Sequence, residues 1–208
     1  MSRPERRAYL VYGAGGHGKV VADLVLDSGE TLLGFIDDDP RRAEEAMFGL
    51  PVRSLSEWLK SGNPRVALGI GDNAVRRSVF QKVREAGLPL ATLVHRSASV
   101  ARSAELGDAT VAMAGCVVNA DARIGLGAIL NSGCVVEHDV ILGDFVHVSP
   151  SAALGGGARV GPGTHIGMGA MVLPGIRIGA NVRVGAGAVV TRAVDDGVTL
   201  VGVPARPR

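Results

Sequence analysis

The strongest constraint on the fold is a strict six-residue repeat that runs from residue 94 to residue 190. Every sixth position of this segment is apolar, at seventeen successive places and without a slip in register. Helices repeat near 3.6 residues and strands near 2, so neither produces a period of six. A six-residue period indicates a left-handed parallel β-helix instead. The repeating positions are Val94, Val100, Leu106, Ala112, Val118, Ile124, Leu130, Val136, Leu142, Val148, Leu154, Val160, Ile166, Val172, Ile178, Val184 and Val190.

The repeat also predicts how each coil is built. One hexad supplies a short strand and a tight corner, so three hexads, or eighteen residues, close a triangular coil. The apolar residue points inward, and a small residue four places later, such as Ala98 or Ala152, fills the space beside it. Glycine directly follows the apolar residue in eight hexads, beginning with Gly107, and we expect it to relieve strain at corners with positive φ. Stacked coils then pair their backbones at a strand spacing of about 4.8 Å.

Composition agrees with a solenoid and excludes some classes of function. Of 208 residues, 30 are glycine and only 3% are aromatic, which suits a prism too narrow for large rings. The net charge of +2 predicts neither a nucleic-acid partner nor a membrane surface. Cys116 and Cys134 are eighteen residues apart at interior positions, so we expect buried thiols rather than a disulfide. Residues 1–7 lead into no signal-peptide core and no membrane span is evident, so we expect a cytoplasmic protein.

Residues 1–92 follow a different pattern, in which predicted strands and helices alternate. Strands are predicted over 8–12, 32–36, 65–70 and 90–94, and helices over 19–27, 55–59 and 74–85. This alternation is typical of a small parallel α/β domain of the Rossmann type. We expect the β-helix to follow over 93–193, and a C-terminal tail over 194–208 to leave the solenoid.

A glycine-rich loop joins the first predicted strand to the first helix. Gly13, Gly15 and Gly18 match the motif G-x-G-x-x-G. Glycines in this pattern let the backbone approach a diphosphate at the N-terminus of a helix. Asp37 follows at about the spacing expected of an acidic residue that binds ribose. The alternative is a tight turn without a ligand. The domain is short of two mononucleotide-binding halves, so a nucleotide sugar is favoured over NAD. His17 is either a donor to the phosphate or sugar, or a residue that caps the helix.

In the solenoid, His138 lies between Glu137 and Asp139. An imidazole with an ordinary pKa of about 6.5 can accept a proton at neutral pH, so we interpret His138 as a general base. Asp139 or Glu137 can hold its tautomer and stabilise the imidazolium. One coil further, residues 155–157 are all glycine, and the three missing side chains predict a notch above His138. The alternative is a surface histidine beside a chance run of glycines.

Two further histidines, His147 and His165, are eighteen residues apart and should stack on adjacent coils. His138 and His147 are nine residues apart, or half a coil, so they cannot share a pocket within one chain. A shared site would need two prisms, and threefold packing is the natural closed arrangement. The histidine spacings do not suit a zinc site of the γ-carbonic anhydrase type, so we expect no metal.

Together these motifs resemble those of the bacterial sugar acetyltransferases grouped with sialic acid O-acetyltransferase. The resemblance covers nearly the whole chain. That family includes N-acetyltransferases that modify UDP-linked 4-amino sugars in bacillosamine synthesis and others that modify GDP-perosamine. The motifs that carry the resemblance are residues 12–18, Ile70-Gly71-Asp72-Asn73, Glu137-His138-Asp139, residues 143–150 and Gly202-Val203-Pro204-Ala205.

The resemblance implies an acetyl-CoA-dependent homotrimer with active sites between its subunits. His138 would be the base, and Asp139 would raise its basicity. Acetyl-CoA would contact His147, and, through backbone groups, Met168 and Ala186. The nucleotide-linked amino sugar would bind Gly15, Gly16, His17, Asp37, Asp38, Gly71 and Asn73.

The sequence is also compatible with three rival functions. The first is an O-acetyltransferase that acts on a sugar hydroxyl or on free sialic acid. The second is a non-catalytic solenoid that binds sugar nucleotides, and the third is a zinc lyase. The sequence does not identify the nucleotide, the sugar or the pathway, nor whether Glu137 or Asp139 is the main partner of His138.

Overall fold

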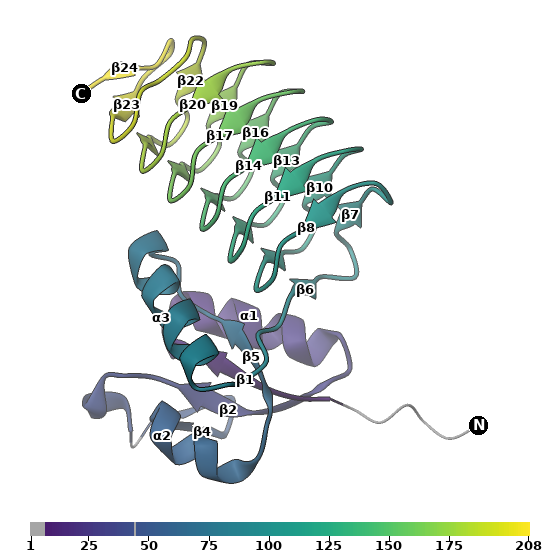
Figure 1. Ribbon diagram of the computed structural model, residues 1–208, viewed down its shortest axis with the longest axis vertical. Helices are drawn as coiled ribbons and strands as arrows, with labels where there is room; N and C mark the ends of the chain where they lie inside the picture. Colours follow the sequence, from purple (N-terminus) through teal and green to yellow (C-terminus); the bar gives the residue numbers. More distant parts are fainter. Residues whose placement is uncertain (1–6, 44) are drawn as a thin grey trace. The chain divides into compact units, whose positions relative to one another are not determined.

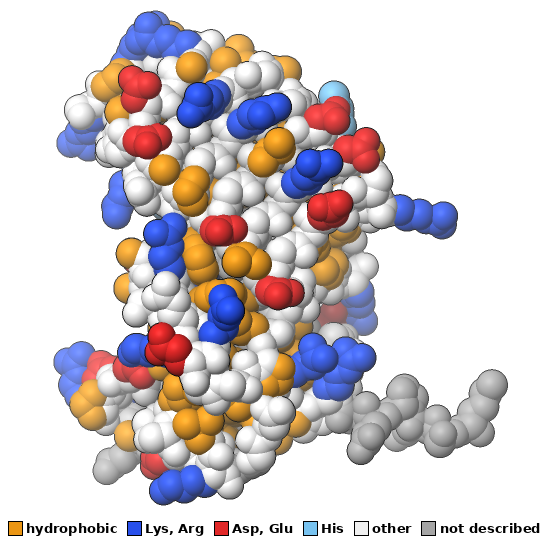
Figure 2. All heavy atoms as spheres, viewed as in Figure 1, with side chains coloured by type: hydrophobic (Ala, Val, Ile, Leu, Met, Phe, Trp, Pro, Cys, Tyr) orange, Lys and Arg blue, Asp and Glu red, His pale blue; other side chains and the backbone are white. Residues whose placement is uncertain are grey.

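The computed structural model describes residues 7–43 and 45–208, which form two compact units. The first unit extends to Leu93 and the second begins at Val94. Residues 1–6, which contribute to the expectation about a signal peptide, lie outside the described residues. Within the described ranges, no helix has the length and apolar character needed to cross a bilayer. On the face shown in Figure 2, acidic and basic side chains are interspersed, in keeping with a net charge of +2.

The first unit is a small α/β domain around a five-stranded sheet with the order β3-β4-β2-β1-β5 (Figure 1). Four strands are parallel, and β3 alone pairs in the antiparallel direction, with β4. The carboxyl ends of β1, β2 and β5 therefore meet at one edge, where sheets of this type bind ligands. The elements are β1 (Ala8–Tyr12), α1 (Gly16–Asp27), β2 (Thr31–Ile36), η1 (Pro40–Arg42), β3 (Ala46–Met47), β4 (Leu50–Arg53), α2 (Leu55–Trp58), η2 (Leu59–Ser61), β5 (Arg65–Leu68) and α3 (Asn73–Glu85).

The structure confirms the predicted alternation and corrects several boundaries. Helix α1 begins at Gly16 rather than residue 19, because the end of the glycine loop is already helical. Strand β5 ends at Leu68, two residues early. The hairpin of β3 and β4 was not predicted, since strands of two and four residues carry no readable periodicity. The predicted strand over 90–94 is divided into a single bridge between Val66 and Leu90 and the short strand β6, which spans the boundary between the two units at Leu93 and Val94.

The second unit is the predicted left-handed parallel β-helix, whose stacked coils are visible in Figure 1. We name its three sheets faces 1, 2 and 3. Pairing joins residues eighteen apart, as in Val117 with Val135, which is one coil of three hexads. Face 1 contains β6 (Leu93–Val94), β9 (Val111–Ala112), β12 (Ile129–Leu130), β15 (His147–Val148), β18 (His165–Ile166), β21 (Arg183–Val184), β23 (Thr199–Val201) and β24 (Arg206–Pro207). Face 2 contains β7 (Ser99–Val100), β10 (Val117–Val118), β13 (Val135–Val136), β16 (Ala153–Leu154), β19 (Met171–Val172) and β22 (Val189–Val190). Face 3 contains β8 (Glu105–Leu106), β11 (Arg123–Ile124), β14 (Ile141–Leu142), β17 (Arg159–Val160) and β20 (Arg177–Ile178).

The interior of the prism is filled by the repeating apolar residues and the small residues four places later. Cys116 and Cys134 are buried there as free thiols, as predicted. Only the start of the repeat departs from the pattern: Val94 is 44% exposed, and Val100 and Leu106 are partly buried. These residues belong to the first coil, which has no further coil beneath it in this unit.

The corner glycines act differently from the prediction. The glycine directly after the apolar residue does not have positive φ, and at Gly107 an added Cβ would lie 2.6 Å from the backbone of Gly125 in the next coil. These glycines are therefore required by close coil stacking. The left-handed corner residue instead comes three places after the apolar residue, as at Gly133 (φ 66°) and Asp139 (φ 60°).

The C-terminal tail does not leave the solenoid where we expected. Val194 forms a bridge with Ile178, and β23 pairs with β21 through Thr199 and Arg183. Both pairings span sixteen residues instead of eighteen, so the final coil is shorter and lies outside the six-residue period. The hairpin of β23 with β24 then ends face 1.

Candidate active site

Two of the loop glycines are required by the fold of the first unit. Gly13 has φ of 110°, and an added Cβ there would lie 2.7 Å from the carbonyl oxygen of Gly69. An added Cβ on Gly18 would overlap the carbonyl oxygen of Gly13. The strand, loop and helix therefore pack closely enough to explain these two glycines without any ligand.

Gly15 and Gly16 have no such explanation. Neither has positive φ, and an added Cβ at either position would meet no atom within 4 Å. Gly15 is the N-cap of α1 and provides no side-chain cap, so the first N–H groups of the helix face the surface in the manner of an anion site. Because Gly15 occupies the N-cap, His17 is not the capping residue, and that alternative is wrong.

A cavity of about 400 Å³ opens at the carboxyl ends of β1, β2 and β5. Six of the seven residues predicted to bind the nucleotide sugar line it: Gly15, Gly16, His17, Asp37, Asp38 and Gly71. Asn73 is not in this lining; its Oδ1 accepts a hydrogen bond from Arg76 Nη2 at 2.8 Å. Tyr12, Ile70 and Val79 also contribute to the wall, although they were not among the residues predicted to bind the nucleotide sugar.

The two acidic residues at the end of β2 have different environments. Asp37 accepts hydrogen bonds from the N–H groups of Ala14 (2.8 Å) and Asp39 (3.0 Å), so its carboxylate fixes the glycine loop. Asp38 accepts hydrogen bonds from the Tyr12 hydroxyl and the Lys82 ammonium, both at 2.7 Å. Burial opposes ionisation of Asp38, but the hydrogen bonds from Lys82 and Tyr12 outweigh it and lower the pKa of the carboxyl group. The carboxylate of Asp38 is thus a charged part of the cavity wall.

Arg76 is a fully buried guanidinium beneath the loop that follows β5. Its Nη1 donates to the carbonyl oxygens of Ile70 (3.1 Å) and Gly71 (3.0 Å), which holds that side of the cavity in place. Burial, together with the positive charge of Arg76, lowers the pKa of His17 to about 4. His17 is therefore neutral at physiological pH and can donate or accept hydrogen bonds.

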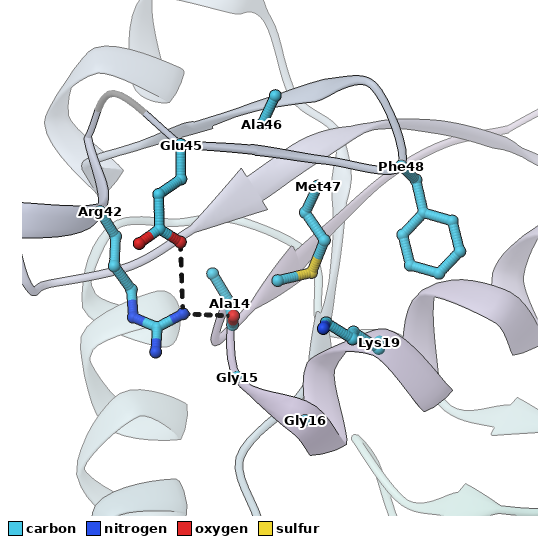
Figure 3. A pocket seen from close by; sticks show the side chains of 9 residues that line it. All are labelled: Ala14, Gly15, Gly16, Lys19, Arg42, Glu45, Ala46, Met47 and Phe48. Carbon is cyan, nitrogen blue, oxygen red and sulfur yellow. Dashed lines mark hydrogen bonds and ion pairs between the residues drawn. The ribbon is translucent and has the colours of Figure 1, made fainter.

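A second cavity, of about 470 Å³, lies on the other side of Gly15 and Gly16. Figure 3 shows Lys19 on α1 and Arg42 on opposite sides of it, below the β3–β4 hairpin that carries Phe48. Arg42 is anchored, because its Nη1 donates to the carbonyl oxygen of Ala14 at 2.6 Å and lies 3.6 Å from Glu45. Two cations therefore flank the exposed N-terminus of α1.

In the solenoid, His138 lies in the corner between faces 2 and 3. Its Nδ1 is 2.8 Å from Asp139 Oδ2, and the side chain is 62% exposed. A carboxylate accepts, so Nδ1 carries the proton and Nε2 is the basic atom. The hydrogen bond to Asp139, aided by the charge of Glu137, raises the pKa of His138 despite some desolvation. Glu137 itself accepts a hydrogen bond from Asn119 at 2.9 Å, so Asp139 is the direct partner.

The notch above His138 exists, but one glycine makes it. An added Cβ on Gly156 would lie 2.6 Å from His138 Nε2, whereas one on Gly155 would meet the backbone of Pro174 at 2.6 Å. Gly157 has φ of 68° and meets nothing, so it is a corner glycine. The basic nitrogen of His138 thus faces the space that the missing side chain of Gly156 leaves.

The residues predicted to contact acetyl-CoA lie elsewhere on the prism. His147 is buried on face 1 and stacks on His165, as predicted, with 4.7 Å between ring centroids and 8° between planes. Met168 and Ala186 are exposed at the corner between faces 1 and 2, one coil apart, where the N–H of Gly187 donates to the carbonyl oxygen of Met168 at 2.8 Å. Face 2 therefore separates this group from His138. Among the described residues, no cluster of three or more His, Cys, Asp or Glu side chains could hold a metal ion.

Comparison with known proteins identifies the family to which the chain belongs. Residues 9–83 match the model of the PglD N-terminal domain, and residues 157–192 match the bacterial transferase hexapeptide (six repeats). PerB from Caulobacter crescentus, solved in complex with CoA and GDP-perosamine, is 40% identical with a TM-score of 0.92, over 97% of each chain. Another structure of that protein describes it as perosamine N-acetyltransferase. The chain belongs to this sugar N-acetyltransferase family.

Two further relatives support the assignment of this chain to the sugar N-acetyltransferase family. The acetyltransferase domain of PglB from Neisseria gonorrhoeae, solved with acetyl coenzyme A, is 37% identical with a TM-score of 0.91, over 98% of this chain and 100% of that one. UDP-N-acetylbacillosamine N-acetyltransferase of Bacillus subtilis is 41% identical over 109 residues. That match covers 50% of the present chain, and the chain spans about half the length of this curated relative.

Sequence reasoning missed several residues around the candidate site. Lys82 reaches Asp38 across 44 positions of sequence, and no local pattern predicts such a contact. Arg42 and Arg76 donate hydrogen bonds to backbone carbonyl oxygens that come close to them only in the folded chain. Asn131, by contrast, could have been found from the six-residue repeat. It lies next to the stacked histidines of face 1, and Ser149, eighteen residues later, occupies the same position one coil further.

Proposed function

We propose that this protein transfers the acetyl group of acetyl-CoA to the amine of a nucleotide-linked amino sugar, with His138 as the general base. The observation that carries the proposal is the geometry around His138. Asp139 holds Nδ1–H, so the lone pair of Nε2 points into the space over Gly156. An imidazole held in this way can accept a proton from a bound nucleophile.

The reaction is a direct transfer within a ternary complex. The neutral sugar nitrogen attacks the thioester carbonyl carbon while His138 Nε2 accepts the proton that the nitrogen loses. The tetrahedral intermediate then breaks its C–S bond, and the proton passes from His138 to the leaving thiolate. The products are an amide and free coenzyme A. Neither buried cysteine is required, because no acyl-enzyme is formed.

The first unit supplies the nucleotide site. The diphosphate would lie over Gly15 and Gly16 at the N-terminus of α1, where the absence of side chains is otherwise unexplained. Lys19 and Arg42 flank this position and balance the charge of the diphosphate. The charged Asp38 in the adjoining cavity favours a cationic or hydroxyl-rich sugar there. The relatives solved with GDP-perosamine and named for UDP-N-acetylbacillosamine support a nucleotide-linked amino sugar as the acceptor.

A threefold assembly would complete the catalytic site. His138 and the group of His147, Met168 and Ala186 lie on opposite sides of face 2, so a single prism does not bring them together. The outer row of face 2 is apolar and partly exposed, with Val135, Ala153 and Met171 in register, and it offers a surface for a second copy. In a closed ring, His138 of each subunit meets His147 of the partner subunit.

Two experiments test the proposal. Wild-type protein should acetylate a UDP- or GDP-linked 4-amino sugar. In His138→Ala, kcat should fall at least about a hundredfold, which is the usual contribution of a general base. Activity of His138→Ala within threefold of wild type would contradict the role of His138. Acetylation of the corresponding hydroxyl sugar, with no reaction of the amine, would indicate O-acetyl transfer instead.

Subunit mixing tests the assembly. Equal amounts of His138→Ala and His147→Ala subunits, unfolded and refolded together, should recover about a quarter of wild-type activity, because that fraction of shared sites receives both histidines. Each variant refolded alone is the control. No recovery from mixed trimers, verified by light scattering, would show that each site belongs to one chain.

A further inference from the structure

Asp38 is held by two hydrogen-bond donors, an arrangement that the proposed reaction does not by itself explain. The Tyr12 hydroxyl donates to Oδ1 of the carboxylate, and the Lys82 ammonium donates to Oδ2, each at 2.7 Å. Tyr12 ends β1 and Lys82 belongs to α3, so the two donors come from different elements. Because each oxygen has its own donor, the carboxylate keeps one orientation although the Asp38 side chain is 51% exposed.

Tyr12 is a permanent donor in this arrangement. Its side chain is buried at the end of β1 and lines the same cavity as Asp38. Burial raises the pKa of the phenol above its ordinary value of 10, and the hydrogen bond to Asp38 and the negative charges of Asp38 and Asp37 add to the rise. The phenol therefore keeps its proton at physiological pH and donates its hydrogen bond to Asp38.

Helix α3 brings Lys82 to the same carboxylate. Val75, Val79 and Lys82 are spaced by four and three residues, so they follow one side of the helix. Val75 and Val79 line the cavity, and Lys82 follows them by about one turn and reaches Asp38. The apolar wall that α3 contributes to the cavity therefore ends at an ion pair with Asp38.

Lys82 changes what Asp38 can bind. Its ammonium lies 2.7 Å from the carboxylate and compensates the negative charge. A ligand ammonium at Asp38 would have to compete with Lys82, whereas a hydroxyl needs only one of the about four acceptor positions of a carboxylate. The other acid of this wall, Asp37, accepts hydrogen bonds from the N–H groups of Ala14 and Asp39 and so fixes the glycine loop. Asp38 is therefore the acid suited to a neutral ligand group that carries hydroxyls.

We propose that Lys82 is a positioning residue: with Tyr12 it holds Asp38 as an oriented, charge-compensated acceptor for hydroxyl groups of the nucleotide sugar, and it keeps the sugar amine out of this cavity. The ligand rests on the proposed function, whereas the clamp formed by Tyr12 and Lys82 rests on their two contacts with Asp38. An amine beside an uncompensated carboxylate would be stabilised as an ammonium, which has no lone pair for attack. Excluding the amine therefore keeps it available as a nucleophile.

The clamp is tested without any ligand by ¹³C NMR of protein labelled at aspartate, with Asp38→Asn used to assign the signal. Burial opposes ionisation of Asp38, but the hydrogen bonds from Lys82 and Tyr12 outweigh it and lower the pKa of the carboxyl group. As the pH is lowered, protonation of Asp38 should begin at a higher pH in Lys82→Met than in wild type, and Lys82→Arg should restore the wild-type behaviour. Arg84→Met, on the same helix but over the ring of Phe80, is the matched control and should titrate like wild type. Thermal unfolding followed by circular dichroism verifies that each variant is folded.

Calorimetry without acetyl-CoA measures the consequence for the ligand. It compares a UDP- or GDP-linked 4-amino sugar with its 4-hydroxyl counterpart, below neutral pH, where the amine is protonated. In Lys82→Met the hydroxyl sugar should bind about tenfold more weakly, the effect of about one hydrogen bond. The ratio of the two dissociation constants should move at least about fivefold towards the amino sugar, because the carboxylate is no longer compensated. Arg84→Met should leave both constants within about twofold of wild type.

Asp38→Asn tests whether Lys82 acts through Asp38. In that background Lys82→Met should cause no further change in either dissociation constant, because no carboxylate remains to be positioned. Losses that simply add would show that Lys82 contacts the ligand itself and would overturn its positioning role. Steady-state kinetics provide a second readout, since the KM for acetyl-CoA should stay within about twofold of wild type in every variant.

The remaining outcomes separate the clamp, its role and the proposed function. An unchanged titration of Asp38 in Lys82→Met would overturn the clamp. A changed titration with the same preference between the two sugars would overturn the role of Lys82 in ligand selection. A protein that binds the sugars as expected but acetylates neither would refute the proposed reaction and leave the assignment of Lys82 supported.

Discussion

Replacing Gly156 with alanine should remove the proposed base catalysis by His138 while it preserves the fold. Gly156 does not have positive φ, so alanine fits the backbone at this corner. The three atoms nearest to an added Cβ all belong to the ring of His138, at 2.6 Å from Nε2, 2.7 Å from Cε1 and 3.2 Å from Cδ2. These distances are far inside van der Waals contact, so the imidazole must move. Because its side chain is 62% exposed, it can rotate into solvent, and the hydrogen bond to Asp139 is then lost.

The expected magnitudes follow from this geometry. Losing the aligned base should lower kcat about a hundredfold, near the lower limit of general-base contributions. The free energy of unfolding should change by less than about 1 kcal/mol, because no buried group is displaced. Release of the coenzyme A thiol measures kcat, and denaturant titration measures stability.

A double-mutant cycle provides the control. In a His138→Ala background there is no ring for the new methyl group to meet, so Gly156→Ala should cause no additional loss of activity. The reasoning would be refuted if Gly156→Ala kept activity within threefold of wild type. It would also be refuted if the two losses simply added.

Further predictions concern charge, pH and the glycine loop. Asp139 has φ of 60°, which asparagine also tolerates, so Asp139→Asn removes mainly the charge. Because Asp139 raises the pKa of His138, the pH at which kcat/KM rises should be lower in this variant than in wild type. The pKa of His17 is about 4 in the folded protein against an ordinary 6.5. The contribution of neutral His17 to the free energy of unfolding should therefore be fully present above pH 6.5 and fall by up to about 3 kcal/mol as the pH drops to 4. Urea titration should show this loss in wild type but not in His17→Asn. Gly18→Ala should unfold the first unit at a lower denaturant concentration because its Cβ overlaps the carbonyl oxygen of Gly13. Gly16→Ala should leave the unfolding midpoint unchanged but weaken calorimetric binding of the nucleotide sugar about tenfold or more.

The six-residue period alone determined the architecture of the second unit. A strand pairing of eighteen residues follows from three hexads a coil, so stacking of His147 on His165 and burial of Cys116 and Cys134 could be read directly from sequence positions. Prediction works here because each coil contacts only its neighbours, so sequence distance translates into spatial distance. The same reasoning failed at residue 194, where the coil shortens to sixteen residues and the hydrophobic period ends.

Contacts between distant segments were decided only by the tertiary structure. The motif G-x-G-x-x-G did not reveal that Gly13 and Gly18 are required for packing, whereas Gly15 and Gly16 face open space. Of the three glycines above His138, the structure singles out Gly156. The physical reason is that a side chain's role depends on which atoms lie within a few ångströms of it. In the α/β unit these atoms come from segments whose separation in the sequence follows no period, so the chain must fold before its partners are known.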